Sequence, residues 1–201
     1  MRYRTLVCFA ALFLAPRLLP GVASAQPRGT SPHVVIQTEL GDIEIEVDTV
    51  RAPGTAANFL KYVDARHYDG GTWHRTVKMD NQPENQIKIE VIQAGVSSDK
   101  AKAGFPPIPL ERTNKTGILH KDGTVSMARG VADSATSGIF ICINDQPSLD
   151  FGGTRNADGQ GFAAFGQVVR GMDVVRKIQR APNTDAQKLT PPITIIAVTR
   201  R

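Results

Sequence analysis

The sequence predicts a mainly β domain, a closed barrel with two helices that cover its ends. Three observations predict this fold class. Short apolar runs bounded by glycine, proline and other turn residues recur along most of the chain, as expected of strands. Only two segments place apolar residues at helical spacing. The chain also contains no internal repeat and no low-complexity tract, which favours one ordinary folded domain.

The first 25 residues are typical of a cleaved export signal. Arg2 and Arg4 precede an apolar run at 5–15, and the small residues at 23–25 provide a cleavage site. A retained membrane anchor is the alternative, but the apolar run is shorter than the ~20 residues that a membrane span needs. We therefore expect no stable membrane insertion and a periplasmic or secreted location.

The mature chain is expected to begin at Gln26, with a flexible lead over 26–32 and the folded domain over 33–201. Removing 25 of the 201 residues leaves 176, enough for one hydrophobic core. The signal takes three of the 24 basic residues and none of the 19 acidic ones, so the net charge falls to +2. The sequence contains no Lys/Arg cluster with interleaved aromatic residues, so nucleic acid is not an expected partner. The one remaining cysteine, Cys142, cannot form an intramolecular disulfide.

The first half of the domain predicts a hairpin, a helix and two further strands. Two runs of alternating polarity at 33–48 are joined by a Gly-Asp pair, which predicts the hairpin. From Pro53 onward, apolar residues recur at helical spacing until a Gly-Gly pair ends the helix. Strand-like residues follow at 72–77 and 87–94, on either side of a polar insert.

The second half begins with a proline- and glycine-rich stretch at 97–117, which predicts an irregular surface loop. A second helix is predicted at 171–181, with Met172, Val175 and Ile178 on one face. The remaining segments are a glycine-rich loop at 147–161 and four strands, at 123–129, 137–145, 162–169 and 191–200.

Common catalytic motifs are absent from the sequence. It contains no G-x-S-x-G elbow, no H-E-x-x-H and no P-loop. The four histidines lack the spacing of a metal site. A calcium loop starting at Thr154 fails, because Phe165 would occupy its last ligand position. We therefore expect neither a metal nor another cofactor.

Arg75 and Gln93 stand out, because strand interiors rarely hold an arginine unless it has a partner or a task. An arginine paired with an acid is the structural alternative. With apolar residues around them, one guanidinium and one amide suit a non-covalent task. Such a slot accepts an apolar ring and contacts the peptide carbonyls beside it. The apolar candidates are Phe140, Leu149, Phe162 and Phe165, although Phe165 also fits the core.

Five motifs carry a family resemblance: "TELGDIEIEVDTVRAPGTAANFLKYVDARHYDGGTWHR", "EVIQAG", "GTVSMARGVADSATSGIFICIND", "LDFGG" and "GFAAFGQVVRGMDVV". They occur in this order over nearly all of the mature chain and resemble the cyclophilin-type peptidyl-prolyl cis-trans isomerases, most of all the bacterial exported branch. The resemblance implies an eight-stranded barrel with two capping helices and isomerase activity on exported proteins. It also implies a monomer without cofactor, whose partners are proline-containing unfolded or partly folded polypeptides.

The resemblance also assigns the site residues. Arg75 of "WHR" and Gln93 of "VIQAG" match the catalytic pair, and Arg75 is expected to stabilise the twisted imide without covalent chemistry. His74, beside the arginine, is expected to pack near the site rather than transfer a proton. The expected substrate-binding residues are Val91, Ala128, Phe140, Leu149, Phe162 and His74.

The sequence departs from the family pattern at several of these places. Gly138 replaces the usual glutamine, Ser148 an aromatic residue, and Glu90 the pocket phenylalanine. Arg129 replaces an asparagine and is expected to face solvent, and a polar insert at 78–88 replaces a short turn. These changes favour a second hypothesis, a weakly active proline-peptide-binding module or holdase. A third hypothesis, a barrel that binds a small apolar ligand, requires a deep internal cavity.

Overall fold

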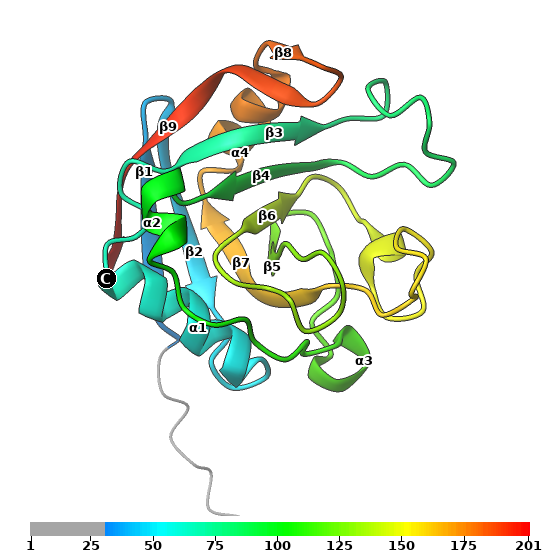
Figure 1. Cartoon of the computed structure of the whole chain (residues 1–201), viewed down its shortest axis with the longest axis horizontal. Coiled ribbons are helices and arrows are strands. Elements are labelled where there is room, and N and C mark those ends of the chain that lie inside the picture. The colour runs from blue at the N-terminus through cyan, green and yellow to red at the C-terminus, as the bar shows by residue number, and fades with distance from the viewer. Residues whose placement is uncertain (1–30) are drawn as a thin grey trace, which may run out of the picture. The chain divides into compact units, whose positions relative to one another are not determined.

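The computed structural model describes residues 31–201, and the predicted signal lies outside the described residues. Figure 1 shows a barrel with helices against it. The strands are β1 (His33–Thr38), β2 (Gly41–Val47), β3 (Thr72–Val77), β4 (Val91–Gly95), β5 (Thr124–Met127), β6 (Ile139–Cys142), β7 (Ala163–Arg170), β8 (Asn183–Thr184) and β9 (Lys188–Arg200). The helices are α1 (Pro53–Asp64), α2 (Ser98–Lys102), α3 (Thr113–Thr116) and α4 (Met172–Arg180), with a 3₁₀ turn at Pro147–Leu149.

Eight antiparallel strands close into the predicted barrel. Their order is β1-β2-β7-β5-β6-β4-β3-β9, and β9 pairs back with β1. The two-residue strand β8 pairs only with β9 and lies outside the closed ring. Closure leaves each of the eight ring strands paired on both sides, which removes the edges of an open sheet.

The two predicted helices are present and pack on different strands. Helix α1 packs against β7 and β9, and α4 packs against β2, β3 and β4. Pro53 occupies the first turn of α1, where its missing N–H leaves no bond unmade. Val175 and Ile178 of α4 are fully buried, and Met172 packs against the same core. None of the helices in the described chain is long and apolar enough to cross a membrane.

The stretch at 97–117 is more regular than predicted, because it contains α2 and α3. Each of these helices is about one turn long, so neither can show the repeated apolar spacing that identifies a helix in a sequence. Helix α3 ends at Gly117, whose φ of 69° is readily adopted by glycine.

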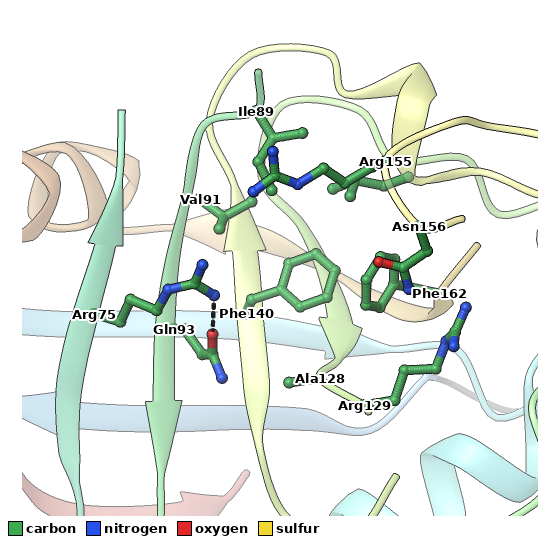
Figure 2. A pocket seen from close by; sticks show the side chains of 11 residues that line it. Arg75, Ile89, Val91, Gln93, Ala128, Arg129, Phe140, Arg155, Asn156 and Phe162 are labelled. Carbon is green, nitrogen blue, oxygen red and sulfur yellow. Dashed lines mark hydrogen bonds between the residues drawn. The ribbon is translucent and has the colours of Figure 1, made fainter. Parts of the chain in front are cut away.

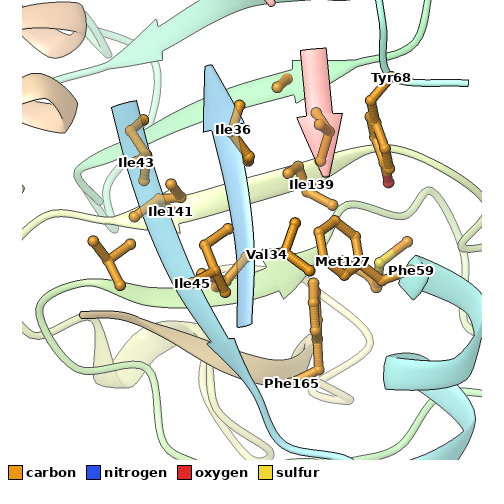
Figure 3. Packing of buried hydrophobic residues seen from close by; sticks show 14 of the residues in the cluster. Val34, Ile36, Ile43, Ile45, Phe59, Tyr68, Met127, Ile139, Ile141 and Phe165 are labelled. Carbon is orange, nitrogen blue, oxygen red and sulfur yellow. The ribbon is translucent and has the colours of Figure 1, made fainter. Parts of the chain in front are cut away.

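Apolar side chains fill the barrel interior. Figure 3 shows the isoleucines of β1, β2 and β6 meeting Met127, Phe59 and Phe165. The rings of Phe59 and Phe165 lie 5.0 Å apart, and both residues are fully buried. Phe165 is therefore part of the core. An interior packed with side chains excludes the third hypothesis, a barrel with an internal ligand cavity.

Candidate active site

A pocket of about 210 Å³ lies on the outer side of the barrel wall. Figure 2 shows its lining side chains, which come from β3, β4, β6, the 3₁₀ turn and the loops before β4, after β5 and before β7. The lining residues are Arg75, Ile89, Val91, Gln93, Ala128, Arg129, Phe140, Leu149, Arg155, Asn156 and Phe162. Seven of the eight residues predicted for the site are in this set, and His74 is not.

Strand alternation separates the pocket from the core. On β4, Val91 and Gln93 face the pocket, while Ile92 and Ala94 belong to the core cluster inside the barrel. On β6, Phe140 faces the pocket between two core isoleucines. Because successive side chains of a strand point to opposite faces, the same strands supply both the interior and the site.

An irregularity in β3 places Arg75. Simple alternation would put Trp73 and Arg75 on the same face, yet Trp73 is buried in the core and Arg75 lines the pocket. The register of β3 shifts between these two residues, against both β4 and β9. An extra residue of this kind re-aims the side chain that follows it. His74 is that extra residue; its side chain is exposed, which explains why it does not line the pocket.

Two glutamines hold the Arg75 guanidinium. Its Nη1 donates to Oε1 of Gln93 at 2.8 Å. Its Nε and Nη2 both donate to Oε1 of Gln187, at 2.9 and 2.6 Å. Among residues 31–201 no carboxylate lies within ion-pair distance of Arg75, so the alternative of a structural ion pair is wrong. Burial, and then the charge of Arg155, lower the pKa of Arg75 from its ordinary value.

Gln187 was not predicted. It follows two residues with positive φ, Asp185 and Ala186, in the turn between β8 and β9. Its carbonyl accepts from the backbone N–H of Thr76, and its Nε2 donates to the carbonyl of Asn81 at 3.3 Å. Gln187 stands 112 residues from Arg75, so no local pattern could reveal the contact.

The polar insert at 78–88 is ordered by its own side chains. Asn81 accepts from the backbone of Lys78 and donates to that of Thr76. Gln82 is buried, and its side-chain amide accepts from the backbone N–H of Ile89 and donates to the carbonyl of the same residue. These bonds take the place of strand pairing, which explains why β4 begins at Val91 rather than at 87. Through Asn81, the insert also supports the glutamine that holds Arg75.

Aromatic rings form the floor of the pocket. The ring of Phe140 stands edge-on to Phe162, with centroids 5.3 Å apart, and stacks on His120 at 5.9 Å. His120 is buried, with Nδ1 2.7 Å from Asp150 Oδ1 and Nε2 3.0 Å from Ser126 Oγ. This Ser-His-Asp chain resembles a hydrolase triad, but Ser126 is fully buried. Its role is to fix the histidine beneath Phe140.

Glu90, which replaces the usual pocket phenylalanine, does not line the pocket. Glu90 accepts hydrogen bonds from Asn144 at 2.8 Å and Gln179 at 3.2 Å, away from the lining residues. Its neighbours Ile89 and Val91 supply the apolar wall instead. The departure at Glu90 therefore leaves this wall of the pocket apolar.

The expectation that Arg129 faces solvent is wrong. Its side chain is only 1 % exposed and binds Asp158 through two nitrogens, at 2.8 and 3.0 Å. It also donates to the carbonyl of Gly161, and its guanidinium carbon lies 5.0 Å from the Phe162 ring centre. Arg129 lowers the pKa of Asp158 to about 2. Together these contacts tie the 150–161 loop to the pocket.

Comparisons with known proteins agree with this geometry. The family model described as "Cyclophilin type peptidyl-prolyl cis-trans isomerase/CLD" matches residues 33–200. The chain belongs to this family. The relatives include peptidyl-prolyl cis-trans isomerase A of Dickeya dadantii, 40 % identical over 75 % of this chain and 73 % of that protein. Peptidyl-prolyl cis-trans isomerase B of Escherichia coli is 34 % identical over 73 % of this chain and 83 % of its own.

The structure of this chain also resembles that of a solved cyclophilin. A cyclophilin of Cryptosporidium parvum, crystallised in the presence of the dipeptide Ala-Pro, superposes with a TM-score of 0.68 at 20 % identity. The alignment covers 84 % of this chain and 98 % of that one. The closed barrel of this chain is thus a cyclophilin barrel.

Proposed function

We propose that this cyclophilin speeds X-Pro isomerisation by stabilising the twisted imide with Arg75, and that it serves exported proteins as they fold. The observation that carries the proposal is the guanidinium of Arg75, held by two neutral amides beside an apolar floor. Neutral partners orient the cation without cancelling its charge. That charge is then available to the bound peptide.

The chemistry needs no covalent step. A peptide bond resists rotation with a barrier of ~18–20 kcal/mol because its nitrogen shares its lone pair with the carbonyl. At the perpendicular transition state the sharing is lost, and the proline nitrogen regains a basic lone pair. A guanidinium N–H aimed at that nitrogen stabilises the twisted state more than either planar isomer, which is the condition for rate enhancement.

The remaining pocket residues orient the peptide. Oε1 of Gln93 already accepts from Arg75, so its Nε2 is the group that donates to a peptide carbonyl. Phe140, Leu149 and Val91 offer the apolar surface for the pyrrolidine ring. Each CH₂ that leaves water contributes ~0.8 kcal/mol, so the ring alone contributes about 2–3 kcal/mol, less than the roughly 4 kcal/mol of millimolar affinity. Such weak binding suits an enzyme that releases many clients.

A binding module or holdase with the same barrel and little turnover is the second candidate. It is favoured by Gly138 and Ser148, because neither residue lines the pocket where the family usually has a glutamine and an aromatic side chain. A side chain at position 138 would be crowded, because its Cβ would lie only 3.3 Å from the Cβ of Ala128. Peptide affinity without turnover would select this candidate.

A protease-coupled assay on a proline-containing tetrapeptide tests the proposal. We expect Arg75→Ala to lower kcat/KM by about 10²-fold or more, as loss of one transition-state donor does elsewhere. Arg180→Ala, which removes an exposed cation that does not line the pocket, is the matched control. An equal rate for wild type and Arg75→Ala would remove the mechanism. Export is tested separately, by cell fractionation and by a mature N-terminus at Gln26.

A further inference from the structure

Three guanidiniums line one small pocket, and only one of them is neutralised. Arg129 is paired with Asp158. Arg75 is held by glutamines, and Arg155 donates to the backbone carbonyl of Ile87 at 2.5 Å. None of the eleven lining residues in the described chain is acidic. The pocket therefore carries two positive charges without an internal counter-charge.

Arg155 is placed to act on a bound peptide. It comes from the glycine-rich loop between the 3₁₀ turn and β7, and its bond to Ile87 joins this loop to the end of the polar insert. In Figure 2 its side chain runs beside Ile89 and Val91, across the pocket from Ala128. A proline ring on Phe140 would leave the side chain of a neighbouring residue within reach of Arg155.

The electrostatics favour an anion at that place. The charge of Arg155 is close enough to lower the pKa of Arg75, and burial lowers the pKa of Arg155 itself. A carboxylate between or beside the two guanidiniums would relieve both effects. Arginine also binds a carboxylate through two parallel N–H bonds, a geometry that lysine cannot offer.

We propose that Arg155 is a specificity-determining residue that selects clients with aspartate or glutamate next to the isomerising proline. This inference rests on the proposed isomerase function and adds the substrate class. Arg75 acts on the imide itself, whereas Arg155 acts on the flanking side chain. Arg75 is held by neutral amides and Arg155 by a backbone carbonyl, so neither guanidinium is neutralised by a carboxylate of the described chain. Both charges are therefore available to the peptide.

Two matched peptide pairs test the inference. In one pair glutamate or glutamine precedes the proline, and in the other it follows it. Affinity is measured by calorimetry and turnover by NMR exchange. Wild type is expected to prefer glutamate by about 5-fold at one of the two positions, the size of a partly exposed charged contact. The preference should shrink as salt rises, because exposed charges are screened.

The variants separate selection from structure. Arg155→Gln is expected to bring the glutamate-to-glutamine ratio of affinity and turnover to about one, and Arg155→Lys to keep part of the preference. If Arg155 were purely structural, its loss would lower affinity or turnover for all four peptides by the same factor and leave the glutamate-to-glutamine ratio unchanged. Arg180→Gln removes an exposed charge outside the pocket and should change nothing.

Each result decides one question. Equal affinity and turnover for glutamate and glutamine at both positions would overturn the inference and leave the isomerase proposal standing. A preference unchanged in Arg155→Gln would also overturn it. If no peptide is turned over, the isomerase proposal fails, and the affinities alone then show whether Arg155 selects an acidic peptide.

Discussion

The two faces of strands β4 and β6 differ sharply in what they carry. Toward the barrel interior they present Ile92, Ala94, Ile139 and Ile141, all fully buried among other apolar side chains. Toward the pocket they present a smaller apolar cluster around Phe140, with the amide of Gln93 beside it. One face stabilises the fold, and the other supplies the apolar floor of the pocket and the amide that binds Arg75 of β3.

The difference teaches that stability and function are separated by strand alternation. Filling the interior with side chains leaves no room there for a ligand. The outer face can therefore hold a cation such as Arg75 at the cost of some desolvation, because the interior already stabilises the barrel. Changes on the two faces should accordingly have different consequences.

The largest effect on stability is expected from the interior. Phe59→Ala removes a fully buried ring that packs on Phe165 and Tyr68, so the free energy of unfolding should fall by about 3–5 kcal/mol. Chemical denaturation measures this free energy. At denaturant concentrations below the unfolding transition, kcat/KM per folded molecule should match that of wild type. A selective loss of activity in a fully folded population would break the separation of the two faces.

A smaller effect, on catalysis, is expected at Gln187. Gln187→Ala frees two nitrogens of the Arg75 guanidinium, so kcat should fall by about 10-fold with KM nearly unchanged. Gln187→Glu keeps the geometry but adds a counter-charge, and it should not restore the rate. Gln160→Ala, which removes a glutamine outside the pocket lining, is the control. Full activity in Gln187→Glu would contradict the need for a neutral partner.

The smallest effect concerns the 150–161 loop. The pKa of Asp158 is lowered to about 2, so the stabilisation from its pair with Arg129 is present above the pKa of the unfolded chain and disappears as the pH falls through about 2. NMR titration of the carboxyl should show this midpoint. In Arg129→Gln it should rise toward 3.8. An unshifted midpoint would mean that the pair does not hold the loop.

The repeating features of the fold were predictable. Alternation located the hairpin and most strands, and helical spacing located α1 and α4. Seven of the eight site residues that the family motifs indicated line the same pocket. The fold predictions were confirmed because each depends on neighbouring residues or on short stretches of sequence.

What the sequence could not predict depends on distant contacts. Gln187 reaches Arg75 from a turn near the other end of the domain, and Asp158 neutralises an arginine 29 residues away. The irregularity in β3 moved His74 out of the pocket, and hydrogen bonds from Asn144 and Gln179 hold Glu90 away from it. One extra residue in a strand moves the side chains that follow it to the other face of the sheet. The strand propensities of single residues do not show where such an extra residue occurs.

The most direct test of the central claim is NMR exchange spectroscopy on a proline peptide with wild type and Arg75→Ala, measuring affinity and catalysed exchange separately. If Arg75 acts on the twisted imide, the peptide Kd should change by less than about 3-fold while the exchange rate of the bound peptide falls by about 10²-fold or more. If affinity falls as much as the exchange rate, Arg75 binds the planar peptide as well as the twisted one, and the account is contradicted.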